Sequence, residues 1–186
     1  MHGWWAVSYV VLWLVVAALA LLALALARQI GILELRLGPR GALEIDGEGP
    51  PLGEAPEPID AVDAAGRTAA IGGPGTSQLL LFVSPDCPVC RDVIPSIGAA
   101  ARIGRLAPLV ISDGPAPHLD RAPAPVVVSE EAARAFGVPG TPYAVVLDDL
   151  GVVRAKGTVN SLEQLEGLVD TARRRLDESP AGANVH

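Results

Sequence analysis

Two cysteines, Cys87 and Cys90, have the type and the spacing for chemistry. They are the only cysteines among the 186 residues, and two residues separate them. The apolar run 78–83 before them predicts a buried strand, which Pro85 would end, and a helix would begin at the cysteines. At such a turn one sulfur can attack a disulfide, and the other can resolve the mixed disulfide that results. The spacing therefore predicts thiol–disulfide exchange.

The helix start would also favour the reactive form of Cys87, because unpaired backbone N–H groups and the helix dipole stabilise a thiolate. A zinc site is one alternative, but His2, His118 and His186 lie far from the pair in sequence and lack ligand spacing. A structural crosslink is another, but so short a loop hardly constrains the unfolded chain. We therefore expect no metal and no cofactor other than a redox-active Cys87–Cys90 disulfide.

A second segment, 137–143, supports this chemistry. Its Thr141–Pro142 dipeptide lies directly before an expected strand. Its position resembles that of the cis-proline of thioredoxin-like proteins, which packs against the dithiol, and the resemblance implies a cis peptide bond here that would expose the Thr141 backbone to an incoming polypeptide strand. An ordinary turn proline is the alternative. Pro88, between the cysteines, would contact the same substrate.

The remaining pattern supplies the elements that must hold these residues in place. Parallel strands alternate with helices and an antiparallel hairpin follows, which predicts an α/β thioredoxin-like fold, a central mixed sheet flanked by helices. Pro95 should kink the first helix, and Ser129 should cap the second. The expected strands are 59–62, 68–71, 79–83, 106–112, 126–128, 143–148 and 152–155, and the expected helices are 87–103, 130–136 and a last helix from residue 161.

The amino terminus has the composition of a membrane span, since the first 27 residues contain no Asp, Glu, Lys or Arg. Residues 4–27 as a helix would be about 36 Å long, enough to cross a hydrocarbon core of roughly 30 Å. A cleaved signal peptide is the alternative, but no basic residue precedes the apolar run. We therefore expect one N-terminal transmembrane helix, with an anchor at 1–28, a Gly/Pro-rich tether at 29–58, the thioredoxin-like domain at 59–176 and a disordered tail at 177–186.

Two opposing signals bear on the side of the membrane where the domain lies. Arg28, Arg36 and Arg40 follow the span and no Lys or Arg precedes it, which favours a cytoplasmic domain. A tethered dithiol is most useful in an oxidising compartment, so we expect the periplasm. The net charge of −7 and the lack of a basic stripe with interleaved aromatic residues exclude nucleic acid as a partner.

Over nearly its whole length, from the anchor to about Arg175, the chain resembles the MauD family of methylamine dehydrogenase accessory proteins. The segments that carry the resemblance are SPDCPVC (84–90), ARAFGVPGTPYAVVLD (133–148) and GVVRAKGTVNSLEQLE (151–166). The C-x-x-C is shared by all thioredoxin-like proteins, whereas the stretch 133–166 is much more specific to this family.

The resemblance implies an accessory factor of methylamine utilization that matures the small (β) subunit of methylamine dehydrogenase. It would form or isomerise the disulfides of that subunit in the periplasm, and a further redox partner would reset the dithiol. By resemblance, Cys87 is the attacking thiol, Cys90 the resolving thiol and Pro142 the cis-proline.

Three other functions are compatible with the residues. The same fold serves a TlpA-like reductase of apocytochrome cysteines, which a low reduction potential would indicate. Ser84-x-x-Cys87 and residues 53–56 weakly resemble a peroxiredoxin-like peroxidase. A non-enzymatic docking scaffold would leave the dithiol without a role. Asp86 would oppose a Cys87 thiolate and Arg91 would favour it, so residue chemistry alone leaves oxidase, isomerase and reductase open.

Overall fold

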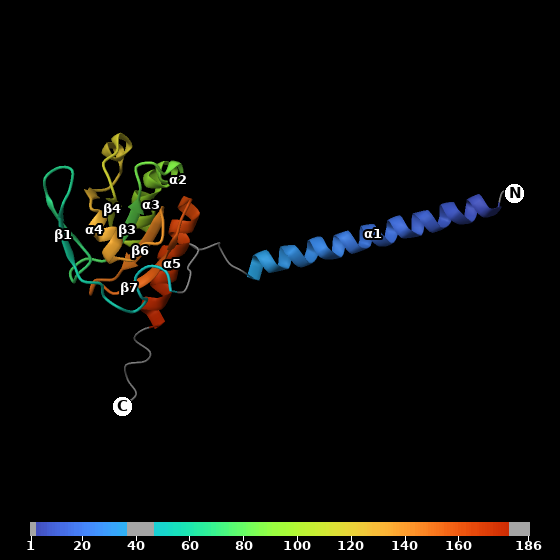
Figure 1. Cartoon of the computed structure of the whole chain (residues 1–186). Coiled ribbons are helices and arrows are strands. Elements are labelled where there is room, and N and C mark those ends of the chain that lie inside the picture. Colours follow the sequence, from blue (N-terminus) through green and yellow to red (C-terminus); the bar gives the residue numbers. More distant parts are fainter. Residues whose placement is uncertain (1–2, 37–46, 179–186) are drawn as a thin grey trace, which may run out of the picture. The chain divides into compact units, whose positions relative to one another are not determined.

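The computed structural model describes residues 3–36 and 47–178, and the chain divides into two compact units, 1–38 and 39–186. The first unit contains helix α1, Gly3–Arg36 (Figure 1). Its segment Gly3–Leu22 has 20 residues and a mean hydropathy of 2.4. A helix of this length measures about 30 Å, which matches the hydrocarbon core of a membrane. The expected N-terminal apolar helix is therefore present.

The second unit is built around a five-stranded mixed sheet of order β5-β4-β3-β6-β7. Strands β3, β4 and β5 run parallel, and β6 is antiparallel to both of its neighbours, β3 and β7. The strands are β3 Gln78–Val83, β4 Ala107–Ser112, β5 Val126–Val128, β6 Tyr143–Leu147 and β7 Val153–Thr158. The sheet is mixed, and its elements follow one another in the expected order.

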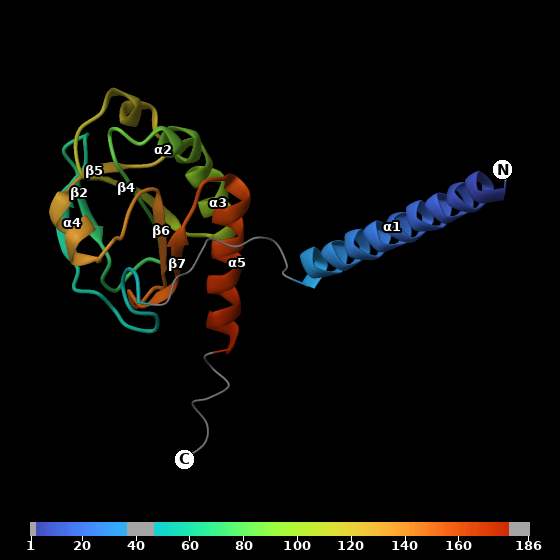
Figure 2. The same cartoon turned by 45° about the vertical axis from the view of Figure 1, so that its right-hand side comes forward.

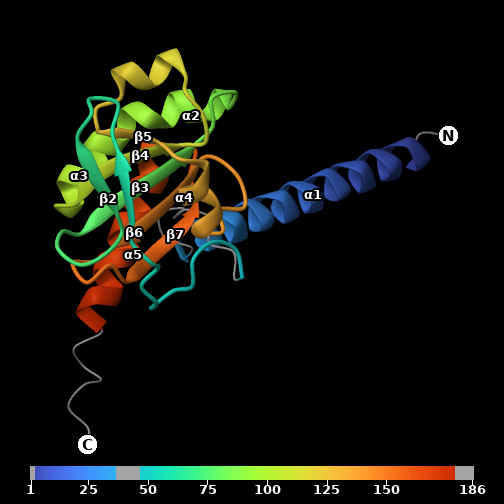
Figure 3. The same ribbon diagram turned by 60° about the vertical axis from the view of Figure 1, so that its left-hand side comes forward.

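Helices cover both faces of this sheet, which is why its strands are continuously apolar rather than alternating. Figure 2 shows α3 and α5 beside the sheet, and Figure 3 shows α4 across its other face. Leu79, Leu81 and Val83 of β3 pack in the cluster with α3 and α5, whereas Leu80 and Phe82 pack in the cluster with α4. The helices of this unit are α2 Pro88–Val93, α3 Ile97–Gly104, α4 Glu130–Ala135 and α5 Leu162–Glu178.

A two-stranded hairpin lies at the β5 edge of the sheet. Its strands, β1 Ile59–Val62 and β2 Thr68–Ile71, pair antiparallel as expected. After β1, the backbone N–H of Ala64 donates to the carbonyl oxygen of Val126 in β5 at 3.0 Å. The hairpin thereby covers part of an edge that would otherwise be open to pairing with another chain.

The helix expected at 87–103 is broken at Pro95. A 3-10 turn, η1 Ile94–Ser96, separates α2 from α3, because proline has no N–H to donate to an α-helical hydrogen bond. Ser129 caps α4 as expected, since its Oγ accepts a backbone N–H of the first turn at 3.1 Å. A second 3-10 helix, η2 Pro117–Arg121, lies where the sequence predicted only a proline-rich connection.

The start of the domain differs from the expected boundary. Residues 47–58, expected in the tether, bond to the domain: the N–H of Gly53 donates to the carbonyl of Val153, and the N–H of Val153 donates to the carbonyl of Glu54, both at 2.9 Å. Glycine and proline in this segment make turns against β7 instead of an extended linker. The expected domain start at residue 59 is therefore too late.

The other boundaries also shift. Helix α1 continues to Arg36, so the first residues of the expected tether are helical. Helix α5 runs to Glu178, so the first two residues of the tail expected to be disordered are helical as well. Residues 37–46 of the expected tether and 179–186 of the expected tail lie outside the described residues.

Candidate active site

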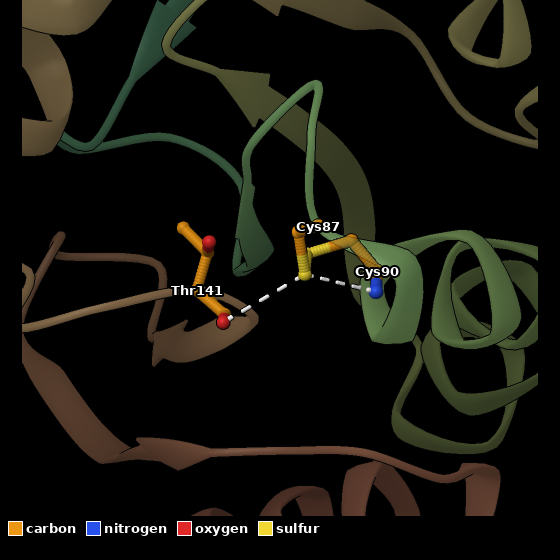
Figure 4. Close-up of a disulfide and its surroundings, with 3 residues drawn as sticks. All are labelled: Cys87, Cys90 and Thr141. Carbon is orange, nitrogen blue, oxygen red and sulfur yellow. Dashed lines mark hydrogen bonds between the residues drawn. A yellow bond between two sulfur atoms is a disulfide. The ribbon is translucent and has the colours of Figure 1, made fainter.

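A disulfide joins Cys87 and Cys90 where β3 leads into α2 (Figure 4). Cys87 is the N-cap of α2, and its Sγ accepts the backbone N–H of Cys90 at 3.1 Å. When the disulfide is reduced, the same N–H can bond a Cys87 thiolate, which favours the reactive form of that sulfur. The pair therefore lies at the strand-to-helix turn that the sequence predicted.

The two sulfurs differ in access. Cys87 is partly exposed, whereas Cys90 has no exposed surface and packs in the apolar cluster of α3 and α5. Cys90 and Val93 form the buried side of α2, while Cys87 precedes the helix at the surface. An incoming thiolate or disulfide can therefore reach Cys87 but not Cys90.

Thr141 lies against the accessible sulfur. Its carbonyl oxygen is 3.8 Å from Cys87 Sγ (Figure 4). The sheet brings the two together, because β3 and β6 are antiparallel neighbours with Phe82 opposite Tyr143. The residues that follow β3 therefore meet those that precede β6. The Thr141–Pro142 peptide bond is cis, as expected.

Apolar surface adjoins Cys87. Pro88, which we expected to contact substrate, is exposed in the first turn of α2, and the neighbouring Val89 is 40% exposed. Asp86 and Arg91 flank the motif and are both exposed, and no hydrogen bond or ion pair holds either side chain within the described residues. These two charges are therefore free to meet a substrate.

No buried carboxylate is hydrogen-bonded to the cysteines within residues 3–36 and 47–178, and β3 contains no acid. The buried polar or charged side chains described are Asp63, Ser112, Asp148 and Lys156. Each of the two carboxylates instead bonds an arginine nearby in sequence, Arg67 or Arg154, at 2.7 Å. In the same ranges, no three His, Cys, Asp or Glu side chains are grouped as metal ligands.

A groove of about 530 Å³ beside Thr141 was not predicted from the sequence. Ser84, Asp113 and Glu130 line it, and they follow the carboxyl ends of β3, β4 and β5. Because the carboxyl ends of parallel strands meet at one edge of a sheet, the strand order was the signal that could have placed these residues together.

Curated relatives match the chain over most of its length, although no protein-family model matches it. Methylamine utilization protein MauD of Methylorubrum extorquens is 40% identical over 173 residues, which cover 88% of this chain and 84% of the relative. MauD of Paracoccus denitrificans is 39% identical over 176 residues, which cover 89% of this chain and 88% of the relative.

Solved structures share the fold at lower identity. The thioredoxin domain of a thiol–disulfide oxidoreductase from Bacteroides vulgatus has a TM-score of 0.52 and 15% identity, covering 67% of this chain and 96% of that one. A thiol:disulfide interchange protein from a Bacteroides species has a TM-score of 0.53 and 15% identity, covering 74% and 97%. The expected thioredoxin-like fold is therefore confirmed.

Proposed function

This chain belongs to the MauD family of methylamine utilization proteins, and on that premise we propose that it is a membrane-anchored thiol–disulfide oxidoreductase that matures the small subunit of methylamine dehydrogenase. The pair Cys87–Cys90 forms or rearranges the disulfides of that subunit. One observation carries the chemistry: an accessible Cys87 is joined to a Cys90 that has no exposed surface.

In disulfide formation, a substrate thiolate attacks Cys87 Sγ, because Cys90 is out of reach. The S–S bond between Cys87 and Cys90 breaks, and Cys90 leaves as a thiolate that takes up a proton. A second substrate thiolate attacks the substrate sulfur of the mixed disulfide, and Cys87 leaves as a thiolate. Two electrons pass from the substrate to the cysteine pair, and a redox partner that itself carries a disulfide or another oxidant takes them up.

In isomerisation, the reduced pair starts the reaction. The Cys87 thiolate attacks a wrongly paired disulfide of the substrate and releases one substrate thiolate. That thiolate attacks a second substrate disulfide, and a further substrate thiolate displaces Cys87 from the mixed disulfide. No electrons are gained or lost, and the N–H of Cys90 bonds Cys87 each time that sulfur carries the negative charge.

A substrate polypeptide lies along Thr141 in this proposal. The carbonyl oxygen of Thr141 is 3.8 Å from Cys87 Sγ. Thr141 precedes β6, so its backbone lies outside the hydrogen-bond ladder of the sheet. An extended chain that carries the target cysteine can therefore add its backbone hydrogen bonds there, as strands do at open edges. Pro88 and Thr141 would then border the substrate cysteine from two sides.

The anchor fits this role. Helix α1 has the length and composition to cross a membrane, and disulfides form and persist in oxidising compartments such as the periplasm. We place the thioredoxin-like domain on the periplasmic side for that reason. Attachment of the domain to the membrane would keep it beside secreted subunits during their folding.

The reduction potential of Cys87–Cys90 tests this function. The full chain, in detergent micelles, is equilibrated in glutathione buffers and the fraction of disulfide is measured by mass spectrometry. A value of about −120 to −180 mV, the range of oxidants and isomerases, is expected. A value of about −270 mV or below would instead make the pair a reductant and would favour the TlpA-like alternative.

A further inference from the structure

Lys156 is the only lysine in the chain, and it is buried in β7 with 4% of its surface exposed. Its Nζ donates to the backbone carbonyl of Glu48 at 2.6 Å. None of the carboxylates in the described residues pairs with it. A buried ammonium without a hydrogen-bond partner is strongly unfavourable. Loss of the hydrogen bond to the Glu48 carbonyl would therefore destabilise the folded domain.

The segment that carries this carbonyl, residues 47–54, is here called the strap. The backbone of Val153 fixes its end, through the two hydrogen bonds to Gly53 and Glu54 described above. Pro50 is buried and Leu52 packs against the apolar cluster of α4. The strap is therefore held along β7, with Lys156 as the side-chain anchor at its beginning.

The strap contacts the residue that ends the active-site loop, residues 137–142, and lies near the residue that begins it. At one end, the hydroxyl of Tyr143, the residue after Pro142, donates to the carbonyl of Glu48 at 3.3 Å. Gly49 has φ +69 and lies so close to the Tyr143 ring that a Cβ there would come within 3.0 Å of Cε1. At the other end, a Cβ on Gly137 would lie 4.0 Å from Gly49 Cα.

We propose that the strap positions the active-site loop for substrate, and that Lys156 is a positioning residue that acts through Glu48 and Tyr143. Tyr143 is the first residue of β6 and directly follows Thr141 and Pro142. The packing of its ring therefore fixes the backbone next to Pro142. Without the strap, Tyr143 loses its cover and Gly137 loses its neighbour. The backbone of Thr141 is then held less tightly beside Cys87, and a bound strand is aligned less well.

This inference rests on the proposed function only in that the loop is taken to bind an extended substrate. It predicts that releasing the strap affects two reactions of the reduced protein differently. Exchange with a disulfide-containing peptide needs an aligned Thr141 backbone, whereas alkylation of Cys87 by iodoacetamide does not. A variant that releases the strap should slow the first reaction and leave the second unchanged.

The test compares Lys156→Met with Arg174→Met, which removes one positive charge from an exposed position on α5. All variants are full chains in detergent micelles. Lys156→Met should slow peptide exchange about fivefold or more, since small misplacements of reacting groups have large effects on rate. Its rate of Cys87 alkylation should equal that of the wild type. Arg174→Met should leave both rates unchanged.

Hydrogen exchange provides the second measurement. In Lys156→Met, the amides of 47–54 and of 137–143 should exchange faster, while those of β3 and α3 should stay protected. Gly49→Ala serves as an independent variant, because it displaces the strap through the Tyr143 ring and leaves Lys156 in place. If Lys156→Met does not fold, Gly49→Ala carries the test with the same expected results.

The inference is overturned if 47–54 is released in either variant while protection of 137–143 and the rate of peptide exchange stay at wild-type values. Equal slowing of peptide exchange and alkylation would also overturn it, because that result indicates general damage to the site. If the wild type itself exchanges no peptide disulfide, the proposed function fails. The hydrogen-exchange measurement still decides whether the strap orders the loop.

Discussion

The carbonyl oxygen of Thr141 lies 3.8 Å from Cys87 Sγ, although the two residues are 54 positions apart in sequence. This contact joins the two halves of the candidate site, the accessible sulfur after β3 and, before β6, the backbone that we propose to bind a substrate. The antiparallel pairing of β3 with β6 creates it, so the site depends on the register of the sheet as much as on its cysteines.

The first prediction concerns the unequal access of the two cysteines. In the reduced full chain, iodoacetamide should modify Cys87 readily, while Cys90 should react only when the domain unfolds, because it has no exposed surface. Peptide mapping by mass spectrometry after timed alkylation measures both rates. Comparable rates for the two thiols in the folded protein would contradict the buried position of Cys90.

The second prediction concerns the core that supports the site. Leu81 in β3 is fully buried, so Leu81→Ala should lower the free energy of unfolding by about 2–5 kcal/mol through lost burial and a residual cavity. Urea unfolding followed by circular dichroism measures the change. Leu150→Ala is the matched control, since Leu150 is 64% exposed in the turn before β7 and its truncation should have little effect.

The third prediction concerns acid stability. The pKa of Asp63 is held below its usual value of 3.8, first because its carboxylate accepts the backbone N–H of Arg67 and then because it accepts the Arg67 guanidinium. Folding therefore favours the charged form. The stabilisation is complete above the unfolded pKa, near 3.8, and is lost as the pH falls through the lowered folded pKa.

Asp63→Asn should destabilise the domain at neutral pH. It should also make the domain lose less stability than the wild type as the pH falls from 3.8 through the lowered folded pKa of Asp63. Thermal unfolding measured from neutral pH down through this range tests both effects. Asp60→Asn is the control, because the Asp60 side chain is exposed in β1 and forms no hydrogen bond or ion pair among the described residues. An acid dependence in Asp63→Asn identical to that of the wild type would show that this carboxylate is not a source of it.

Much of the fold could be predicted because its strands are covered on both faces. The uninterrupted apolar runs in β3 and β6 have no other stable place than the centre of a sheet. The break at Pro95 followed from the missing N–H of proline. The positions of the Cys87–Cys90 disulfide and of the cis Thr141–Pro142 bond could be predicted too, because two cysteines at this spacing and a Thr-Pro before a strand are local signals.

The strap could not be predicted, because its glycines and prolines have the composition of a linker. Only the tertiary contacts of Glu48 and Gly49 show that it belongs to the domain. Lys156 was not predicted either. The alternating pattern predicts a strand that ends at residue 155, whereas β7 continues to Thr158 and the carbonyl of Glu48 satisfies the Lys156 ammonium inside it.

The groove beside Thr141 is lined by residues that follow three separate strands. Asp113 and Glu130 are unremarkable in sequence and become neighbours only through the parallel order of β4 and β5. Their position follows from topology, which local patterns do not encode directly.

The most direct test of the account is to trap the partner. Cys90→Ala is expressed as the full chain together with the small subunit of methylamine dehydrogenase. This variant has no internal disulfide, so its Cys87 thiolate forms a mixed disulfide by attacking a disulfide of the subunit, and no Cys90 thiolate can attack back to release it. Non-reducing electrophoresis and mass spectrometry should find the small subunit bound to Cys87, and Cys87→Ala should bind none and leave the subunit immature. Normal maturation in Cys87→Ala, with no mixed disulfide in Cys90→Ala, would contradict the proposed chemistry and would favour a docking role.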